Sequence, residues 1–265
     1  MPADDLIRLV ETLHAPYGLE RSVKIAPGAL FDDRCLISIH RAALGEAPVD
    51  RLAEMARELR IPASFAEPLV VALKGADVVH FGHEGGPGFE VRKIYLEYAS
   101  QTRRAMATMS DAPVLVHLAY KWSPQRPDGA AVTRYTWTPR RTRGEIEAGL
   151  RAAMPSSEAP RALRCALSLL SRATAHDQSF LPLMMEVEEA GNPRRSCDLN
   201  LYDANLRLSQ IVDLIDSTLM DFAAPRSQGR AAFGPARDMA LGHLSAGVGR
   251  DGEEFVTIYY GIEAH

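Results

Sequence analysis

The chain has 265 residues, a formal net charge of −4 at pH 7 and three widely spaced cysteines. This length suits one large domain or two small ones, and the slightly acidic balance argues against a nucleic-acid-binding protein, in which a basic stripe is usual. Three cysteines without a CxxC pair indicate reduced thiols and offer no cysteine-based zinc site.

The N-terminal stretch MPADDLIRLVETL is acidic and amphipathic, and it lacks the apolar region of a signal peptide. No apolar run approaches the ~18 residues that a membrane-spanning helix needs. We therefore expect a soluble, cytoplasmic protein that binds neither a membrane nor nucleic acid. We expect it to be a monomer or a weak dimer.

Helices and pairs of strands alternate along the predicted chain. Apolar residues at helical spacing predict helices over residues 3–14, 48–60, from Pro62 to about 73, 100–109, 142–154, 158–174, 204–222 and 234–240. Alternation with a period of two predicts five strand pairs: 19–25 with 34–40, 77–83 with 89–98, 113–122 with 131–138, 180–188 with 196–202, and 241–248 with 254–262. Five such hairpins with helices between them form a repeat of about 40–60 residues.

Ten antiparallel strands with helices at every crossover can remove their exposed edges by closing into a barrel. We therefore predict an α+β fold, a ten-stranded antiparallel barrel surrounded by helices, in a single domain over residues 1–265. An open sheet with helices on one face and water on the other would produce the same apolar and polar alternation.

The two faces of the predicted strands differ in character. One face is apolar and should pack on the helices; it includes Val116, Leu183, Met185 and Val187. Aromatic residues are a costly choice for a merely solvated face, so the other face predicts a polar chamber inside the barrel. Its members are Glu20, Ser22, Lys24, Arg34, Ser38, His40, His80, Glu84, Lys93, Tyr95, Glu97, His117, Lys121, Thr133, Tyr135, Trp137, Met184, Glu186, Asp198, Asn200, Tyr202, His243, Ser245, Thr257 and Tyr259.

Four stretches on these strands carry a family resemblance: residues 19–25 (LERSVKI), 34–37 (RCLI), 92–95 (RKIY) and 256–260 (VTIYY). Together with the five αββα units, they resemble the ABBA-fold prenyltransferases. Within that family the sequence looks most like the peptide prenyltransferases of cyanobactin-type pathways, which act in the biosynthesis of ribosomally made, modified peptides. The likeness covers most of the chain in layout and these four stretches residue by residue.

The resemblance implies transfer of an isoprenyl group from an allylic diphosphate, such as dimethylallyl diphosphate, to a linear or cyclic peptide. Glu20 matches the family glutamate proposed to take the proton from the acceptor. Arg34 and Lys93 match cations that hold the diphosphate, and Tyr95 and Tyr259 match tyrosines that shield the allylic cation. Family members use Mg²⁺ with the diphosphate without a DDxxD motif, and the sequence has none.

The residue types suit this chemistry on physical grounds. Ionisation of an allylic diphosphate yields a polyanion and a delocalised carbocation. Fixed cations in a low-dielectric chamber stabilise the polyanion, and Lys24 and Lys121 are further candidates for that role. Aromatic faces stabilise the carbocation by roughly 0.5–2 kcal/mol each, for which Tyr135, Trp137 and Tyr202 are further candidates.

Acids on the chamber face outnumber what diphosphate binding requires. This excess points to a cationic acceptor, such as an arginine guanidinium or a histidine of a peptide, whose nitrogen must lose a proton to attack. The residues predicted to bind the acceptor are Glu97, Glu186, His80, His243 and Ser245.

Several alternatives stay open. Lys93 and Glu97 could be a surface cross-strand pair, and Glu20 could be solvated. Thr133 and Asp198 stand where a cation would help a diphosphate, and Met184 and Glu186 stand where the family places aromatic residues.

These departures leave the pocket size and the acceptor undecided. The alternative functions are prenylation of tyrosine, tryptophan or a small aromatic metabolite, and a ligand-binding barrel without chemistry.

Three histidines, His80, His117 and His243, occupy similar places in three hairpins. Alternate strands of a sheet lie roughly 9–10 Å apart, whereas a histidine–metal bond is about 2 Å. We therefore expect no metal site formed by protein ligands.

Overall fold

Eleven strands form one antiparallel sheet that closes on itself in the computed structural model, which describes residues 2–140, 142–155, 157–192 and 194–265. Strand β11 pairs with β1 and completes a ring of ten strands, and the short β2 extends from β1 outside this ring. The strands are β1 (Gly18–Ala26), β2 (Ala29–Phe31), β3 (Arg34–His40), β4 (Val78–Gly86), β5 (Phe89–Glu97), β6 (Val114–Ser123), β7 (Arg126–Trp137), β8 (Leu183–Glu189), β9 (Arg195–Asn200), β10 (Leu241–Val248) and β11 (Glu254–Ala264).

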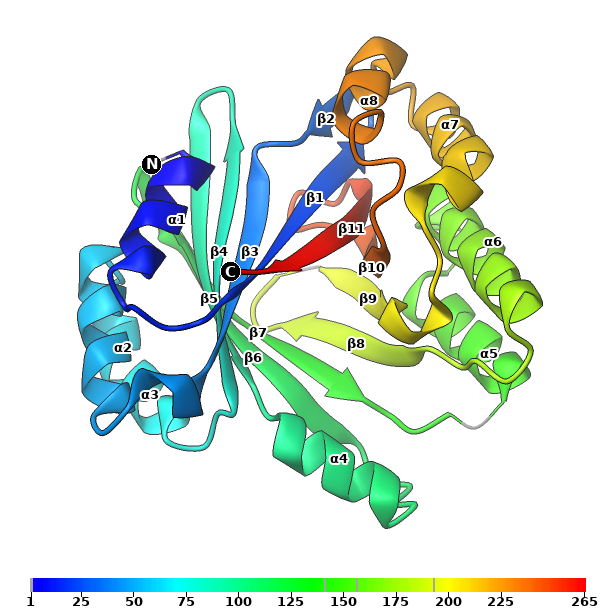
Figure 1. The fold of residues 1–265 in the computed structure, drawn as a ribbon. Helices are drawn as coiled ribbons and strands as arrows, with labels where there is room; N and C mark the ends of the chain where they lie inside the picture. Colours follow the sequence, from blue (N-terminus) through cyan, green and yellow to red (C-terminus); the bar gives the residue numbers. More distant parts are fainter. Residues whose placement is uncertain (1, 141, 156, 193) are drawn as a thin grey trace.

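Helices surround this barrel in two groups (Figure 1). One group covers β3–β5, and the other covers β8–β11; a separate helix, α4, lies at one end of the barrel. The helices are α1 (Ala3–Glu11), α2 (Pro48–Glu58), α3 (Ala63–Leu73), α4 (Ala99–Ala107), α5 (Arg143–Ala153), α6 (Pro160–His176), α7 (Val212–Asp221) and α8 (Arg226–Phe233).

The apolar strand face packs on these helices, as the alternation predicts. Two clusters of buried side chains result. One joins α1–α3 to β3–β5 through residues such as Leu6 and Phe81, and the other joins α5–α7 to β8–β11 through residues such as Leu170 and Val256. The core therefore lies between the barrel wall and the helices, which leaves the barrel interior free for polar side chains.

Local signals fix several helix starts. Pro48 and Pro160 stand in the first turn of α2 and α6. Proline has no N–H, and at this position an N–H would have no acceptor within the helix, so no hydrogen bond is lost. At α5, the Thr142 side chain accepts a hydrogen bond from the Glu145 N–H, and the Glu145 side chain accepts one from the Thr142 N–H. Within the described chain, no helix combines the length and apolarity needed to cross a membrane.

The predicted barrel is confirmed, but the predicted helix over residues 204–222 was wrong in its first half. That segment forms short 3₁₀ turns at Tyr202–Ala204 and Leu208–Ile211, and α7 begins only at Val212. Between the turns, the carbonyl of Leu206 accepts a hydrogen bond from the N–H of Leu241. Pairing with the start of β10 thus satisfies backbone groups that a helix would have used.

The predicted helix over residues 234–240 was also misplaced. The structure has α8 at Arg226–Phe233, and the chain turns from Gly234 until β10 begins at Leu241. In α8, Phe233 is buried against the core while most neighbouring side chains are polar. A single apolar anchor gives too weak a periodic signal to locate a helix from the sequence.

Candidate functional site

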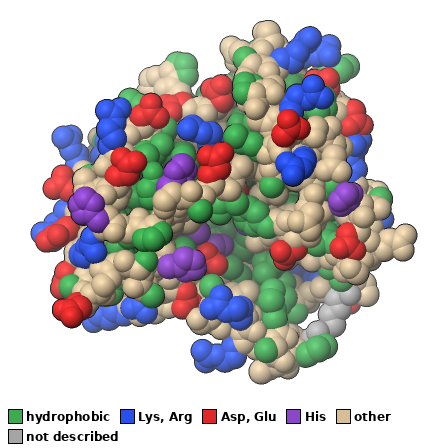
Figure 2. All heavy atoms as spheres, viewed as in Figure 1, with side chains coloured by type: hydrophobic (Ala, Val, Ile, Leu, Met, Phe, Trp, Pro, Cys, Tyr) green, Lys and Arg blue, Asp and Glu red, His purple; other side chains and the backbone are tan. Residues whose placement is uncertain are grey.

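The barrel interior contains a cavity of about 580 Å³ that opens at the end near α4. All ten strands of the ring contribute to its lining, and Thr102 and Met106 of α4 border it. Figure 2 shows the surface hollowed near its middle, where histidine and hydrophobic side chains gather. We call this opening the mouth, and the opposite end, toward the hairpin turns, the deep end.

The interior-facing residues of β5 show how the residue type changes along the chamber. Lys93, Tyr95 and Glu97 alternate with residues that point to the helices, so all three face the interior. Tyr95 and Glu97 line the cavity, whereas Lys93 is buried below it. A cation, a phenol and an acid therefore follow one another from the deep end to the mouth.

Three cations surround one carboxylate at the deep end. Arg34 Nη1 lies 2.5 Å from Glu84 Oε1, Lys93 Nζ lies 2.6 Å from Oε2, and Lys24 Nζ lies 3.8 Å from Oε1. The Arg34 Nε donates a hydrogen bond to Ser22 Oγ. Although burial opposes ionisation of Glu84, these cations hold its pKa well below its usual range. The cluster thus carries an excess of positive charge; Arg34 and Lys93 are buried, and Lys24 is half-buried.

A fourth cation, Lys121, lies directly opposite Lys93 in the β5–β6 pair. Like charges in such positions repel each other. Burial lowers the pKa of Lys93 to about 8 against the attraction of Glu84, and burial and neighbouring cations lower the pKa of Lys121 well below its usual range. Lys121 Nζ donates a hydrogen bond to Tyr135 Oη at 3.2 Å. The protein keeps two facing lysines that an anion between them would stabilise.

Tyrosines form the middle of the chamber. The rings of Tyr95 and Tyr135 lie 5.8 Å apart, and Lys121 Nζ lies 5.7 Å and 5.3 Å from their centroids. Tyr259 lines the same cavity from β11. Trp137 is on the interior face of β7, where it packs against an apolar cluster that includes Tyr135 and Met185, and it is not part of the cavity lining. The tyrosines therefore separate the deep cations from the mouth.

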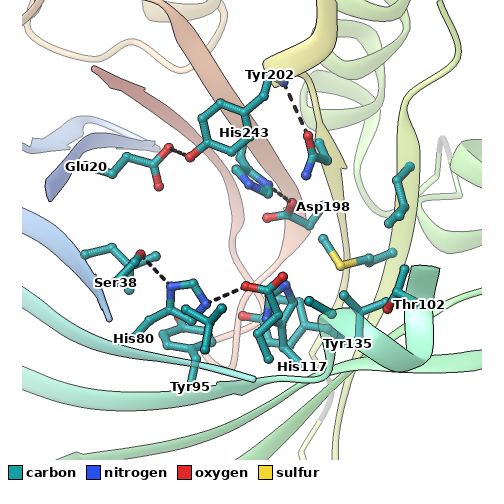
Figure 3. Close-up of a pocket in the computed structure, with 18 of the residues that line it drawn as sticks. Glu20, Ser38, His80, Tyr95, Thr102, His117, Tyr135, Asp198, Tyr202 and His243 are labelled. Carbon is teal, nitrogen blue, oxygen red and sulfur yellow. Dashed lines mark hydrogen bonds and ion pairs between the residues drawn. The ribbon is translucent and has the colours of Figure 1, made fainter. Parts of the chain in front are cut away.

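Glu20 lies near the mouth and is only 3% exposed. The Tyr202 hydroxyl donates a hydrogen bond to Glu20 Oε1 at 2.5 Å, as Figure 3 shows. Burial raises the pKa of Glu20, and the charge of His243 and the Tyr202 hydrogen bond oppose that rise. A buried carboxyl with a raised pKa and a cavity beside it is suited to accept a proton.

Next to this pair, His243 Nδ1 lies 2.6 Å from Asp198 Oδ1, and its ring contacts that of Tyr202 at 5.0 Å. Burial lowers the pKa of His243, but the charge and hydrogen bond of Asp198 outweigh it and raise the pKa to about 9. His243 is therefore an imidazolium at neutral pH that donates to Asp198.

A second polar cluster lies across the mouth. Ser38 Oγ lies 2.7 Å from His80 Nδ1, and His80 Nε2 lies 2.9 Å from Glu97 Oε2. The His117 ring is 5.7 Å from that of His80. Burial opposes ionisation of Glu97, but His80 outweighs it and holds the Glu97 pKa at about 2, whereas burial lowers the His117 pKa to about 4.

Two of the three histidines considered as a metal triad thus come together, and the third does not. His243 pairs with Asp198, while His80 and His117 approach each other on either side of Glu97. The estimate from the spacing of alternate strands was misleading for His80 and His117, because side chains on the inside of a curved barrel wall converge.

The predicted faces of β8 were wrong. Met185 pairs with Asp198 and Trp137, so odd-numbered residues face the chamber, and Leu183 and Met185 line the cavity. Met184 belongs to the core on the helix side. The cause is the sequence itself, because β8 has apolar residues at both parities.

Glu186 therefore does not face the chamber, contrary to its prediction as an acceptor-binding residue. It lies opposite Cys197, which is buried on the helix side, and it pairs with Arg140. Val116 was also misassigned to the helix face: a register shift between Leu115 and His117 in β6 brings it into the cavity lining.

Ser245 faces the interior of β10 opposite Asp198 and Thr257, but it is buried outside the cavity lining. Sequence reasoning placed Glu84 on the chamber face without recognising it as the centre of the cation cluster. It missed Glu189, which accepts a hydrogen bond from Thr133 Oγ1 at 2.6 Å and pairs with Arg250. The correct parity of β8 would have found it.

No protein-family model matches the sequence, and no curated protein matches it. Solved structures do match. The chain is similar to NotF prenyltransferase (12% identity, TM-score 0.57, covering 91% of this chain and 80% of that one) and to NotF in complex with brevianamide F and DMSPP (11%, 0.57, 91% and 79%). It is also similar to AnaPT from Neosartorya fischeri (11%, 0.50, 91% and 77%).

The chain thus has the fold of these prenyltransferase structures, a ten-stranded antiparallel barrel surrounded by helices, as the sequence predicted. At these identities the likeness establishes the fold, and activity has to be argued from the site. The likeness to the cyanobactin-type subgroup stays a prediction.

Proposed function

We propose that the protein transfers a prenyl group, most simply dimethylallyl, from its diphosphate to a nitrogen nucleophile in a peptide side chain such as arginine. The observation that carries this proposal is the order of groups along the barrel axis. Buried cations lie at the deep end, tyrosines follow, and a buried carboxyl with a raised pKa lies near the mouth.

The deep end suits the diphosphate. Arg34, Lys93, Lys24 and Lys121 are basic side chains, and two carboxylates only partly offset them. Glu84 lies among the first three, and Glu189, which is paired with Arg250, acts on Lys121. In a buried site such fixed charges stabilise a leaving diphosphate strongly, because little reorganisation is needed when the charge develops. Here the C–O bond of the donor would break, and the diphosphate would stay on these side chains.

Mg²⁺ was expected to accompany the diphosphate, and the deep end does not suit a protein-held Mg²⁺. This ion prefers oxygen ligands and is usually bound by one or two carboxylates plus substrate phosphates. Glu84 is the carboxylate at the centre of the cluster, and both of its oxygens already contact Arg34 and Lys93. We therefore assign charge neutralisation to the side-chain cations and derive no step through Mg²⁺.

The allylic cation would form beside Tyr95, Tyr135 and Tyr259, whose faces stabilise it by cation–π attraction. The acceptor nitrogen would approach from the mouth and attack this carbon. As the C–N bond forms, the nitrogen loses a proton, and Glu20 is placed to take it. The step balances: the diphosphate leaves with the electron pair of the C–O bond, the nitrogen lone pair forms the C–N bond, and the proton ends on the Glu20 carboxylate.

The mouth favours a cationic acceptor. Glu20, Glu97 and Asp198 all line the cavity there, and carboxylates attract and orient a guanidinium. The cavity is open at this end, which suits a side chain presented by a peptide too large to enter whole.

A mass-spectrometric screen tests the proposal. Purified protein is incubated with C5, C10 and C15 allylic diphosphates and with peptides that differ only in one residue: arginine, histidine, tyrosine or tryptophan. We expect a mass gain of one prenyl group on the arginine peptide. Alkylation confined to the tyrosine or tryptophan peptide would show that the acceptor assignment is wrong.

The same screen separates the rival functions. The fold match includes NotF in complex with brevianamide F and DMSPP, so a small aromatic acceptor is the second candidate, and indoles and phenols belong in the screen. Donor binding without transfer to any acceptor would favour a ligand-binding barrel.

A further inference from the structure

Of His80, Glu97 and His117, the transfer described above uses only Glu97, as one of the carboxylates at the mouth. The three residues come from the neighbouring strands β4, β5 and β6 and line the cavity near its mouth. One ligand atom of each lies within 4.8 Å of those of the other two. Glu97 stands four residues along β5 from Lys93, or roughly 13 Å, so the cluster is remote from the deep cations.

His80 is held in the way that metal-binding histidines are held. Its Nδ1 lies 2.7 Å from Ser38 Oγ, while its Nε2 points at Glu97. A ligating histidine usually gives its other ring N–H to an oxygen, which fixes the ring and its tautomer. Because the Ser38 hydroxyl can accept as well as donate, it can support His80 with Nε2 free for a metal.

His117 supplies an independent observation. Its Nδ1 is buried and has no hydrogen-bond partner among the described residues. Buried polar atoms in proteins are nearly always satisfied, and an unsatisfied one calls for an explanation such as an ion. The chain of hydrogen bonds from Ser38 through His80 to Glu97 does not include His117 and so does not account for its unsatisfied nitrogen (Figure 3).

We propose that His80, Glu97 and His117 bind a divalent transition-metal ion at the mouth of the barrel. Two imidazoles and one carboxylate are a typical set for such an ion when one coordination position stays open. Imidazole nitrogen favours Zn²⁺ and its neighbours over Mg²⁺.

Only modest movement is required. Ligand atoms about 2.0–2.2 Å from a tetrahedral ion lie roughly 3.3 Å from one another. The His80 and Glu97 atoms are already 2.9 Å apart, so the ion would replace their hydrogen bond, and the His117 ring would move inward. The open position would face the cavity, where the ion would act on whatever molecule enters by the mouth.

The metal site shares Glu97 with the proposed acceptor-binding mouth, but its test measures metal binding alone and does not depend on prenyl transfer. Protein dialysed against a chelator is titrated with Zn²⁺ in competition with a coloured indicator, and with Co²⁺ while visible absorption is recorded. We expect saturation at one ion per chain, Co²⁺ bands typical of low coordination number, and no competition from excess Mg²⁺.

Variants assign the ligands. His117→Ala and Glu97→Gln should each abolish the tight site, and Ser38→Ala should weaken it by roughly 10–100-fold, the usual effect of removing a supporting group. His40→Ala is the matched control, because His40 also lines the mouth but lies outside the cluster. This variant should bind Zn²⁺ as tightly as the wild type does.

Circular dichroism and thermal melting establish that each variant is folded. If one of the two ligand variants fails to fold, the other gives the same comparison. Absence of saturable binding by the wild type would overturn the proposal, as would unchanged affinity in both folded ligand variants.

Discussion

Glu20 is the residue at which function and stability conflict. Burial raises its pKa, so the folded protein keeps the proton at pH values where an unfolded glutamate has lost it. The stability of the protonated form is therefore lost as the pH rises through the folded-state pKa. Ionised Glu20, the form that can accept a proton, is the less stable one, which is a common feature of active sites.

We predict that Glu20→Gln lowers turnover by about 10²–10⁴-fold, raises the melting temperature at pH 8 and leaves donor binding unchanged. The glutamine oxygen can still accept the Tyr202 hydrogen bond, so the change removes charge without changing shape. In the wild type, kcat/KM should fall as the pH drops through a pKa above the usual glutamate range. A variant that is less stable and fully active would contradict both assignments.

Glu84 holds the deep cations together before a donor binds. Removing one partner of a buried ion pair typically costs about 3–5 kcal/mol, because the remaining charges lose their counterion. We predict that Glu84→Gln lowers the melting temperature, and that inorganic diphosphate raises it more in this variant than in the wild type. Melting curves with and without diphosphate measure both effects; equal shifts in the two proteins would show that the diphosphate does not bind at this cluster.

At the scale of elements, β10 makes room for the Glu20 carboxyl. The strand has a register shift between Leu241 and Leu244. A Cβ added at Gly242 would lie 2.2 Å from Glu20 Oε1 and about 3 Å from the Tyr202 ring. The irregular strand and its glycine therefore set the position of the pair that is proposed to move the proton.

We predict that Gly242→Ala lowers turnover because it displaces Glu20, while diphosphate affinity is unchanged because the deep end is untouched. Gly144→Ala is the matched control: an added Cβ there meets nothing within 4 Å, and alanine favours a helix. Steady-state kinetics and a diphosphate binding isotherm are the measurements. A loss of affinity equal to the loss of turnover would indicate general damage to the barrel.

The success of sequence reasoning also differed between elements. Strands with strict alternation, such as β4 and β5, were assigned to the correct faces, and His80, Tyr95 and Glu97 line the cavity as predicted. The faces of β8 were assigned wrongly because Met184 and Met185 are both apolar, so the pattern alone could not show which of them faces the chamber. The helix predicted after Tyr202 was wrong in its first half because that segment pairs with the start of β10. Such a pairing between residues far apart in the sequence cannot be read from local periodicity.

Individual contacts between side chains could not be predicted from the sequence. Glu84, Lys93 and Lys121 were visible as polar residues of the chamber, yet their grouping depends on the stagger between neighbouring strands of the barrel. The same stagger brings His80 and His117 to Glu97. Residue type and face can be predicted from alternation, whereas the pairs that form depend on register.

At the scale of the whole molecule, charge is separated along the barrel axis. Cations outnumber acids at the deep end, and the tyrosines lie in the middle. At the mouth, the three acids Glu20, Glu97 and Asp198 outnumber the imidazolium of His243. Such an arrangement directs an anion inward and holds a cation outside, since each end attracts the charge that the other repels. If the chamber works in this way, changes at the two ends should affect different substrates.

We predict that Lys121→Met raises the KM for the diphosphate several-fold and leaves the KM for the peptide unchanged. The change removes, at the deep end alone, an amine that an adjacent anion would keep protonated. Asp198→Asn should do the reverse, because it removes a carboxylate at the mouth and leaves His243 without its ion-pair partner, while the deep end is unchanged. Steady-state kinetics with one substrate varied at a time distinguish the two effects. If either variant raised both constants equally, the two ends would not act as separate binding sites, and the axial order of groups would lose its functional meaning.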